Sequence, residues 1–528
     1  MGPQANRSSQ PHSPKPLSPQ TLTPSLPLVL ILLTAAVLRL WSIDWGAPYL
    51  YHPDEHFILH PALNIVRDGD PNPRFFGYPS LLIYLEAGMV AVTRAYANEP
   101  LTTDPAVTHT GPWDALPSQW PFTLAGRVLV ALCAIGGVWL VYRVGIYWGG
   151  PQVGVAAALF LTASPLHNDS SHYLTTDVPA ATMLTAALLF SLIAAETCDG
   201  TRLAIAGVAA GLAAATKYTA GIIVFVPLGI ALSWSPRVIA WRWAVILGAA
   251  AAGFCIACPY AVLDAERFWR DLVSQRQHYL SGFAPQGNFR WYFAVLCSAG
   301  LTPSIAVLSL VGVFSALLAP AGAGSSSRKV AAVVVSIAIA YFVAVASYPY
   351  RAERNVILLL PVLSTFAAAL CWRVVCAVLP SRATLPVFAV VVLAAAGPGI
   401  IACVHTDQQL GRQDTRTVAL RWIDTNVAPG ARIAREEYTP QVSGERYAVT
   451  YAFSAAAHDY GWYVREGIDY VVLSSNVYDR ALSSPYIMGS AGPAFYDFVF
   501  AHVPLAAEIA PGPERPGPTI RIYAIPHA

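Results

Sequence analysis

The chain has 528 residues, of which 55% are hydrophobic and only 12% are charged. Soluble domains carry about 25% charged residues, so this composition excludes a soluble enzyme and indicates a protein with much of its apolar surface in lipid. The 32 Lys+Arg and 30 Asp+Glu residues nearly balance, leaving a net charge of +2. The chain therefore offers no broad basic surface for nucleic acid.

The amino-terminal segment 1–24 is rich in Pro, Ser, Thr and Gln and contains no acidic residue. Such a composition cannot form a core, so it predicts a disordered tail, which we expect on the cytoplasmic side. The apolar run that follows leads into Arg39, Trp41 and Trp45. This pattern is typical of a membrane edge and not of a signal-peptide cleavage site, so we expect the first span to be retained.

Apolar runs of roughly the length that crosses ~30 Å of hydrocarbon recur through the next part of the chain. They lie near 25–43, 126–147, 152–166, 177–195, 202–216, 219–234, 243–260, 291–319, 330–347, 355–372 and 384–404. One further run, 78–98, is ambiguous because Glu86 interrupts it and Pro79 begins it.

The basic loops favour a surface position for 78–98. With that position, the basic loops between the spans lie on the same side as the amino terminus, as the positive-inside rule requires. These loops contain Arg143, Arg202, Arg237, Arg242, Arg328, Lys329, Arg373 and Arg382. The prediction is a polytopic α-helical membrane protein with about 11 spans over 25–404, a long outer loop at 44–126 and an outer carboxyl terminus.

The last part, 405–528, lacks long apolar runs and is typical of a soluble α/β domain. Apolar residues at helical spacing predict a helix over 414–426, and short apolar runs predict strands at 431–434 and 470–474. No glycine-rich phosphate loop is apparent in this sequence. We expect this domain to lie outside the cytoplasm and to act as a lid or in acceptor recognition.

The first candidate site residues are Asp54 and Glu55, which follow the first span in the string His52-Pro53-Asp54-Glu55. Adjacent carboxylates at a membrane edge are costly unless they are paired or used. Asp54 could instead cap the helix that follows, and a glutamate suits a first helical turn. Asp177, in a tight turn before the next span, adds a third acid to the same face and so favours a functional site.

Candidate cations are predicted on the same face. Lys217 lies in a break between two apolar runs, and Arg351 and Arg354 share the loop 348–355 with Glu353 as a candidate partner. Lys217 could simply extend its ammonium group to water. Arginine, however, offers a planar fork for phosphate oxygens, and lysine a compact charge. Carboxylates and cations on one face indicate a base for an acceptor hydroxyl and positive charge for a departing lipid phosphate.

These strings together resemble the GT-C superfamily, specifically the family 39-like branch of protein O-mannosyltransferases and aminoarabinose transferases. The resemblance is carried by Asp54-Glu55, the Tyr-x-x-Thr-Asp-x-Pro string at 173–179, Lys217-Tyr218 and the Arg351/Arg354-Asn355 loop. It covers about residues 25–404, which is most of the chain.

The resemblance implies an inverting transfer of a hexose or pentose from a polyprenyl-phosphate donor to an acceptor hydroxyl at the outer face. It implies that Asp54 is the base, that Glu55 supports it and that Asp177 shapes the site. It also implies that Lys217, Arg351 and Arg354 lie near the donor phosphate. The α/β domain departs from the β-trefoil insertion of eukaryotic O-mannosyltransferases, which disfavours protein Ser/Thr acceptors. The acceptor stays open between a glycan, a lipid and a protein.

Particular residues also bear on a metal site and on other functions. His52, His56 and His60 have a spacing that can bind a metal, but Pro61 disturbs that helical turn, so we expect no metal and no cofactor. A lipid-linked sugar flippase or transporter would carry ionisable residues near the bilayer midplane, whereas the charges here gather at one edge. A non-catalytic assembly subunit would not need Asp54 and Glu55. The alanine-rich composition favours a bacterial plasma membrane.

Overall fold

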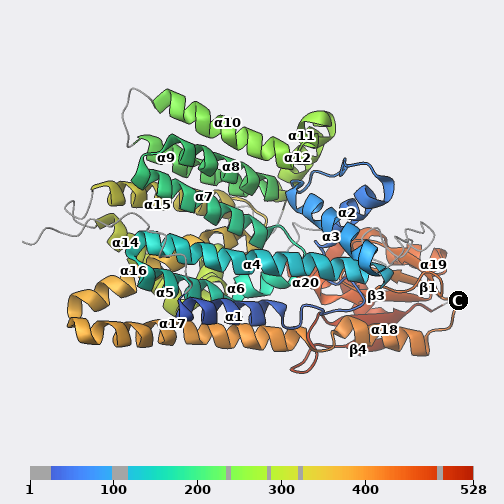
Figure 1. Cartoon of the computed structure of the whole chain (residues 1–528). Coiled ribbons are helices and arrows are strands. Elements are labelled where there is room, and N and C mark those ends of the chain that lie inside the picture. Colours follow the sequence, from blue (N-terminus) through green and yellow to red (C-terminus); the bar gives the residue numbers. More distant parts are fainter. Residues whose placement is uncertain are drawn as a thin grey trace, which may run out of the picture.

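A computed structural model describes residues 25–97, 117–232, 239–281, 287–318, 325–483 and 491–526. The predicted tail 1–24 and part of the predicted outer loop lie outside the described residues. A long bundle of helices makes up most of the molecule, and the carboxyl-terminal sheet lies against one end of it (Figure 1).

Helices dominate the first three quarters of the chain, because a backbone in lipid must satisfy its hydrogen bonds within its own segment. The helices are α1 (Leu26–Leu40), α2 (His56–Asp68), α3 (Leu81–Ala97), α4 (Trp120–Gly149), α5 (Pro151–Thr162), α6 (Pro165–Asp169), α7 (Asp177–Thr197), α8 (Gly200–Thr216), α9 (Phe225–Leu232), α10 (Ile239–Ala257), α11 (Tyr260–Leu263), α12 (Ala265–Leu280), α13 (Phe289–Val295), α14 (Thr302–Leu318), α15 (Ser325–Ser347), α16 (Leu360–Val378) and α17 (Ser381–Leu410). Short 3₁₀ segments lie between them: η2 (Pro117–Gln119), η3 (Ser170–His172), η4 (Tyr218–Val224) and η7 (Glu353–Leu359). One segment, η6 (Leu296–Gly300), is a π-helix.

Within the described ranges, six helical segments are long and apolar enough to cross a membrane. They are Trp120–Gly149, Asp177–Thr197, Ile239–Ala257, Arg328–Ser347, Glu353–Val378 and Ser381–Asn426. A bent pair of helices raises this number to 7, and four shorter apolar helices accompany them. The predicted helical membrane architecture is therefore confirmed, whereas the number of 11 spans stays a prediction.

The run 291–319, predicted as one span, forms two helical segments. Phe289–Gly300 and Thr302–Leu318 meet at an angle of 115°. Thr302 has a positive φ of 61°, and Pro303 beside it has no N–H to donate. The backbone therefore leaves the helical path at this point. The bent pair crosses a membrane only as one broken span or not at all, so one span over this run stays a prediction. Hydropathy does not register the break itself.

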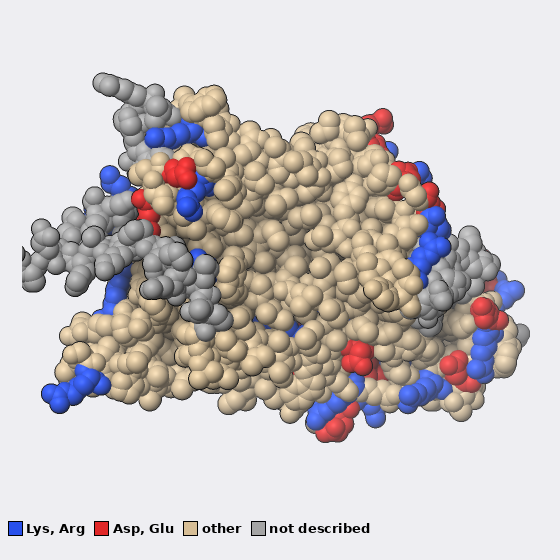
Figure 2. Space-filling view, viewed as in Figure 1, with Lys and Arg blue, Asp and Glu red and all other residues tan. Residues whose placement is uncertain are grey.

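The helices place the acidic residues and the basic loops at opposite ends of the bundle. α7 begins at Asp177 and α8 returns to end beside Lys217, so Arg202, near the turn between them, lies about a helix length from both. α15 and α16 run to and from the 348–354 loop in the same way. Figure 2 shows a broad belt almost bare of charged residues between the two ends, as expected for a surface in lipid.

The carboxyl-terminal part forms an α/β module around a 5-stranded sheet of order β2-β1-β3-β5-β4. Its strands are β1 (Arg432–Arg435), β2 (Ala448–Tyr451), β3 (Tyr470–Ser474), β4 (Leu505–Ile509) and β5 (Ile520–Ala524), and its helices are α18 (Thr415–Asn426), α19 (Tyr460–Arg465), α20 (Ser475–Ser483) and α22 (Ala491–His502). β1 pairs in parallel with β2 and β3, whereas β5 is antiparallel to β3 and β4. α18, β1 and β3 confirm the predicted helix and strands to within a residue.

Alternate side chains of the sheet pack into two cores on its two faces. Val472 packs with Ile423 of α18, whereas its neighbours Val471 and Leu473 pack with Tyr496 of α22. Helices thus cover both faces of the sheet. This packing fixes the loops at the strand ends, one of which borders the candidate site.

Candidate active site

Asp54 and Glu55 lie in a turn that directly precedes α2. α2 begins at His56, and no side chain caps its first N–H groups at Glu55. The Asp54 amide instead donates a hydrogen bond to Nδ1 of His52 at 3.2 Å. Neither carboxylate is therefore engaged as a helix cap, and the capping interpretation of Asp54 does not hold. The two adjacent acids have separate partners.

Glu55 forms a fully buried ion pair with Arg127 of α4. Both side chains are 0% exposed, and the Arg127 Nε and Nη2 atoms lie 2.7 and 2.8 Å from the two Glu55 carboxylate oxygens. Glu55 also accepts a hydrogen bond from the amide of Leu174. This two-pronged geometry is the strongest form of an arginine–carboxylate pair. Glu55 consequently anchors the turn and leaves Asp54 as its outward carboxylate.

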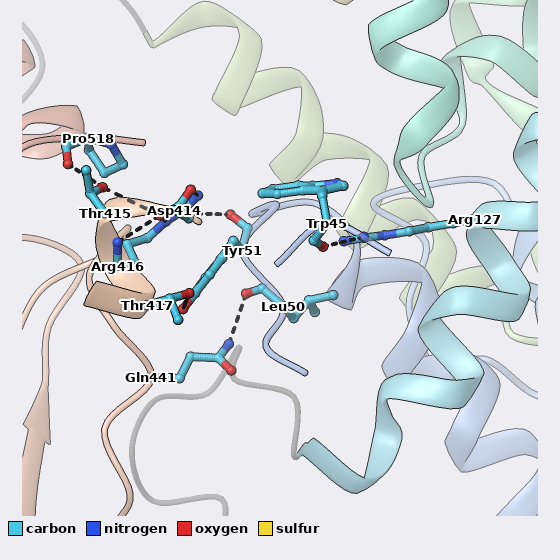
Figure 3. A network of polar contacts seen from close by, with 10 residues as sticks. All are labelled: Trp45, Leu50, Tyr51, Arg127, Asp414, Thr415, Arg416, Thr417, Gln441 and Pro518. Atoms are coloured by element: carbon cyan, nitrogen blue, oxygen red, sulfur yellow. Dashed lines mark hydrogen bonds and ion pairs between the residues drawn. The ribbon is translucent and has the colours of Figure 1, made fainter. Parts of the chain in front are cut away.

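Both sides of the segment that carries Asp54 are held by arginine (Figure 3). On one side Arg127 donates to the carbonyl oxygens of Ile43 and Trp45 at 3.1 and 2.8 Å. On the other side Arg416 of α18 donates to the carbonyl of Tyr51 at 2.8 Å, and its guanidinium lies 4.1 Å from the centre of the Tyr51 ring. The turn is therefore fixed jointly by the helical bundle and the carboxyl-terminal module.

Four of the predicted site residues form a row of ion pairs in which acidic and basic side chains alternate. Arg354 lies 2.8 Å from Asp54 and 3.6 Å from Asp177, measured between guanidinium nitrogens and carboxylate oxygens. Lys217 lies 2.5 Å from the other oxygen of Asp177. Asp177 and Lys217 are almost fully buried, whereas Asp54 and Arg354 keep 15% and 28% of their side chains exposed. The solvent-accessible end of this row of ion pairs is thus the Asp54–Arg354 pair.

The loop that supplies the arginines is held by amides and tyrosines. Asn355 accepts a hydrogen bond from Lys217 at 3.1 Å and donates one to the Tyr292 hydroxyl at 3.0 Å. Arg351 points elsewhere: its Nε donates to Asn288 at 2.7 Å, and its guanidinium lies 5.8 Å from the Trp291 ring. Arg351 therefore supports the loop and does not join the row of ion pairs formed by Asp54, Arg354, Asp177 and Lys217.

The charges around Asp54 keep it ionised. Burial raises the pKa of this carboxyl, but the Arg354 guanidinium, followed by His52, His56 and Lys217, outweighs burial and holds the pKa of Asp54 below its ordinary value. A carboxylate of this kind is ready to accept a proton over the whole neutral range. It is a stronger base once its cationic partner is drawn away.

Aromatic residues surround the accessible pair. Tyr279 and His278, at the end of α12, lie 5.4 and 4.5 Å from the ring of Tyr350, measured between ring centroids. Tyr78, Tyr279 and Tyr350 all lie within electrostatic range of both Asp54 and Arg354. Stacked and edge-on rings with hydroxyl tips suit a ligand that has flat apolar faces and polar edges.

The structure brings Asp54, Asp177, Lys217 and Arg354 together, and places Glu55 and Arg351 beside them in supporting contacts. The sequence offers Glu353 as a candidate partner of the arginines, but Arg354 pairs with Asp54 and Asp177. Sequence reasoning missed Arg127 and Tyr292. The sequence did contain a signal for Arg127, because it is a lone arginine at the start of a predicted span and an intramembrane charge requires a partner.

The three histidines make ring contacts. His52 stacks on Tyr173 with ring centroids 4.4 Å apart, and the ring of His56 lies 6.0 Å from that of His60. Within the described part of the chain, no group of three His, Cys, Asp or Glu side chains is arranged to hold a metal ion.

Comparisons with known proteins bear on the fold of the chain. Residues 122–262 match the family model described as dolichyl-phosphate-mannose-protein mannosyltransferase. ArnT from Cupriavidus metallidurans, in a crystal structure with bound undecaprenyl phosphate, has a TM-score of 0.55 and 15% identity, covering 94% of this chain and 97% of that chain. The resemblance to the GT-C superfamily is confirmed as a likeness of fold.

Two archaeal structures extend the GT-C likeness. The apo oligosaccharyltransferase of Archaeoglobus fulgidus has a TM-score of 0.55 and 15% identity, covering 87% of this chain and 71% of that chain. AglB from the same organism, in complex with an inhibitory peptide and a dolichol-phosphate, has a TM-score of 0.53 and 13% identity with the same coverage. No curated protein matches the chain. At these identities the solved structures establish a GT-C fold.

Proposed function

We propose that this protein is an inverting glycosyltransferase that moves a sugar from a polyprenyl-phosphate donor to an acceptor hydroxyl at the outer face of the membrane. The observation that carries the proposal is the accessible Asp54–Arg354 pair, backed by buried Asp177 and Lys217. The structural neighbours ArnT and AglB, described with undecaprenyl phosphate and dolichol-phosphate, support a lipid-phosphate ligand.

Asp54 acts as the general base in this proposal. It accepts the proton of the acceptor hydroxyl as that oxygen forms its bond to C1 of the sugar. The bond between C1 and the phosphate oxygen breaks on the opposite side, so the configuration at C1 inverts. The electron pair leaves with the polyprenyl phosphate. Arg354 and Lys217 stabilise the negative charge that grows on that phosphate, and Arg351 adds to the positive field.

Donor binding and base strength are linked through Arg354. In the structure, the guanidinium is shared between Asp54 and Asp177. A phosphate offers oxygens with the same geometry and more charge, so it competes for that guanidinium. Asp177 also pairs with Lys217 at 2.5 Å, so in this scheme it keeps a cationic partner, whereas Asp54 loses its main one. Asp54 thereby becomes a stronger base when the donor is present.

Glu55 is a positioning residue in this scheme. Its pair with Arg127 and its hydrogen bond from the Leu174 amide fix the turn that aims Asp54 at Arg354. The helices of 25–404 would form the catalytic domain, and the module of 405–528 would lie beside the site outside the cytoplasm. The basic loops at the far end support this orientation, because positive charge favours the cytoplasmic side. A bacterial plasma membrane remains our proposed location.

The test is transfer by the purified protein in lipid nanodiscs from a panel of labelled polyprenyl-phosphate sugars. Wild type is expected to release one sugar to water or to mixed acceptors, and Asp54→Asn is expected to lose about 10²–10⁴-fold in rate. Asp68→Asn, an exposed aspartate on α2 paired with Arg67, serves as the matched control. Unchanged turnover in Asp54→Asn refutes the assignment of the base, and transbilayer movement of the donor without cleavage favours a flippase.

A further inference from the structure

The helices α11 and α12 form a surface segment at the end of α10 nearest the carboxyl-terminal sheet (Figure 1). α12 has 16 residues, and none of them is buried. It carries three arginines and two acidic residues. A helix of this length is too short to cross ~30 Å of hydrocarbon, so α12 lies at the end of the bundle and does not span the membrane.

One face of α12 is fixed to the rest of the protein. The ring of Phe268 lies 5.6 Å from that of Phe76 and 6.1 Å from that of Tyr218, measured between centroids. Asp271 accepts a hydrogen bond from the Phe76 amide at 2.9 Å. Phe268 and Asp271 are three positions apart and therefore share a face of the helix. This face packs on the loop 70–78.

The opposite face of α12 carries a row of apolar side chains. Trp269, Val273 and Leu280 are 65%, 40% and 51% exposed. Their spacings of four and seven residues place them nearly in line along the helix, because 3.6 residues make one turn. Val273 follows Asp271 by two positions, which is about half a turn. The row therefore points away from the face that packs on the protein.

This row continues an exposed apolar surface that begins on α10. Ile256, near the end of α10, is largely exposed, as are Val262 and Leu263 of α11. α10 is itself one of the helices that are long and apolar enough to cross a membrane, so its exposed apolar side chains face lipid. The surface that continues from α10 through α11 to α12 thus lies at the edge of the same lipid.

The polar residues beside the row fit a layer of lipid headgroups. Arg270 and Arg276 are exposed and flank the row on its two sides. Long arginine side chains can cover apolar surface with their stems and keep their charge among phosphates and water. Tryptophan, as at position 269, is enriched at this depth of a membrane. Such a combination is typical of a helix that lies in the plane of the membrane interface.

We propose that α12 docks on the phospholipid surface of the leaflet nearest the candidate site. Trp269, Val273 and Leu280 insert to a depth of about 5–10 Å, at the boundary between headgroups and acyl chains. The inference does not depend on the proposed glycosyl transfer. It has a consequence for the site, because Tyr279 in the last turn of α12 lies 5.4 Å from Tyr350 between ring centroids. A docked α12 holds this aromatic contact beside the 348–354 loop.

The experiment measures the depth of single fluorescent labels on the full chain in phospholipid vesicles. In a variant without the eight native cysteines, an environment-sensitive label is attached at Val273→Cys or at Leu280→Cys, both in the row. The matched control is Ser274→Cys, the next residue, which is exposed beside the row. Labels in the row should be quenched by phospholipids brominated near the headgroup end of their acyl chains. Aqueous iodide should quench them at least about twofold less than the label at 274.

Two reference positions calibrate the depth. Leu393→Cys, exposed in the middle of α17, should be quenched best by bromines near the ends of the acyl chains, and Ser443→Cys, exposed in the carboxyl-terminal module, by iodide alone. Equal iodide quenching in and beside the row, without quenching by brominated lipid, overturns the inference. Protection of the row from both quenchers also overturns it, because protein then covers the row. Protection that disappears when the protein is diluted would identify that protein as a second copy of the chain.

Discussion

At the scale of single residues, the neighbouring carboxylates of Asp54 and Glu55 have different roles. Glu55 is fully buried, and its carboxylate is bound by Arg127 and a backbone amide. Its role is therefore structural. Asp54 is partly exposed and is paired with Arg354, a cation that a phosphate can take over. Only a group with an exchangeable partner can change its basicity during a reaction. This difference makes Asp54 the candidate base.

Removal of the Arg354 charge provides a pH test of this assignment. In wild type, Arg354 lowers the pKa of Asp54 against the opposing effect of burial. The Arg354→Gln substitution removes the main positive charge that opposes the effect of burial, so the pKa of Asp54 rises. The acidic limb of kcat/KM, which reports the free enzyme, should therefore move to higher pH. The rate should also fall by about 10²–10³-fold, because the departing phosphate loses a cation.

The measurement is a profile of donor turnover between pH 3 and pH 8. Arg354→Lys keeps the charge and should leave the acidic limb close to that of wild type, although it loses the planar fork. An acidic limb at the same pH in Arg354→Gln and wild type would show that a group other than Asp54 titrates.

At the scale of secondary-structure elements, the turn before α2 depends on a contact with α4 across 72 residues of sequence. The Glu55–Arg127 pair joins the two elements, and further hydrogen bonds from Arg127 hold the Ile43 and Trp45 carbonyls. Because neither charge reaches water, each depends on the other. The pair is therefore a point at which a single substitution should disturb both stability and catalysis.

Arg127→Met is expected to destabilise the protein strongly, by about 3–5 kcal/mol, because it leaves the Glu55 carboxylate buried without its cationic partner. The double variant Arg127→Met with Glu55→Leu should recover much of this loss, since no buried charge remains. Thermal unfolding in nanodiscs, followed by intrinsic tryptophan fluorescence, measures the effect. Equal stabilities of the single variant and wild type would contradict a tightly coupled pair.

The same elements show what could be learned from the sequence and what could not. Apolar runs, the strands at 431–434 and 470–474 and the group of Asp54, Asp177, Lys217 and Arg354 were predictable. These features depend on local periodicity or on the cost of charges at a membrane edge. The Glu55–Arg127 pair and the break at Thr302 depend on contacts or backbone angles that a one-dimensional pattern does not contain.

At the scale of the whole molecule, two polar ends are separated by an apolar belt (Figure 2). The candidate site lies where the bundle meets the carboxyl-terminal module, and Arg416 and Gln441 bind the segment that carries Asp54. The basic turns lie at the other end of α7, α8, α15 and α16. A protein built in this way can expose its site to only one side of the membrane.

Cysteine labelling of a variant without its eight native cysteines would determine that side. We expect an impermeant maleimide to label Ser443→Cys, in the carboxyl-terminal module, from outside intact cells. Thr201→Cys, at the start of α8, should react only after permeabilisation, because positively charged turns stay in the cytoplasm. Asp68→Cys and Ser118→Cys flank α3 and should both react from outside if α3 lies on the membrane surface. Labelling of these two positions from opposite sides would make α3 a span, and the predicted topology would then be wrong.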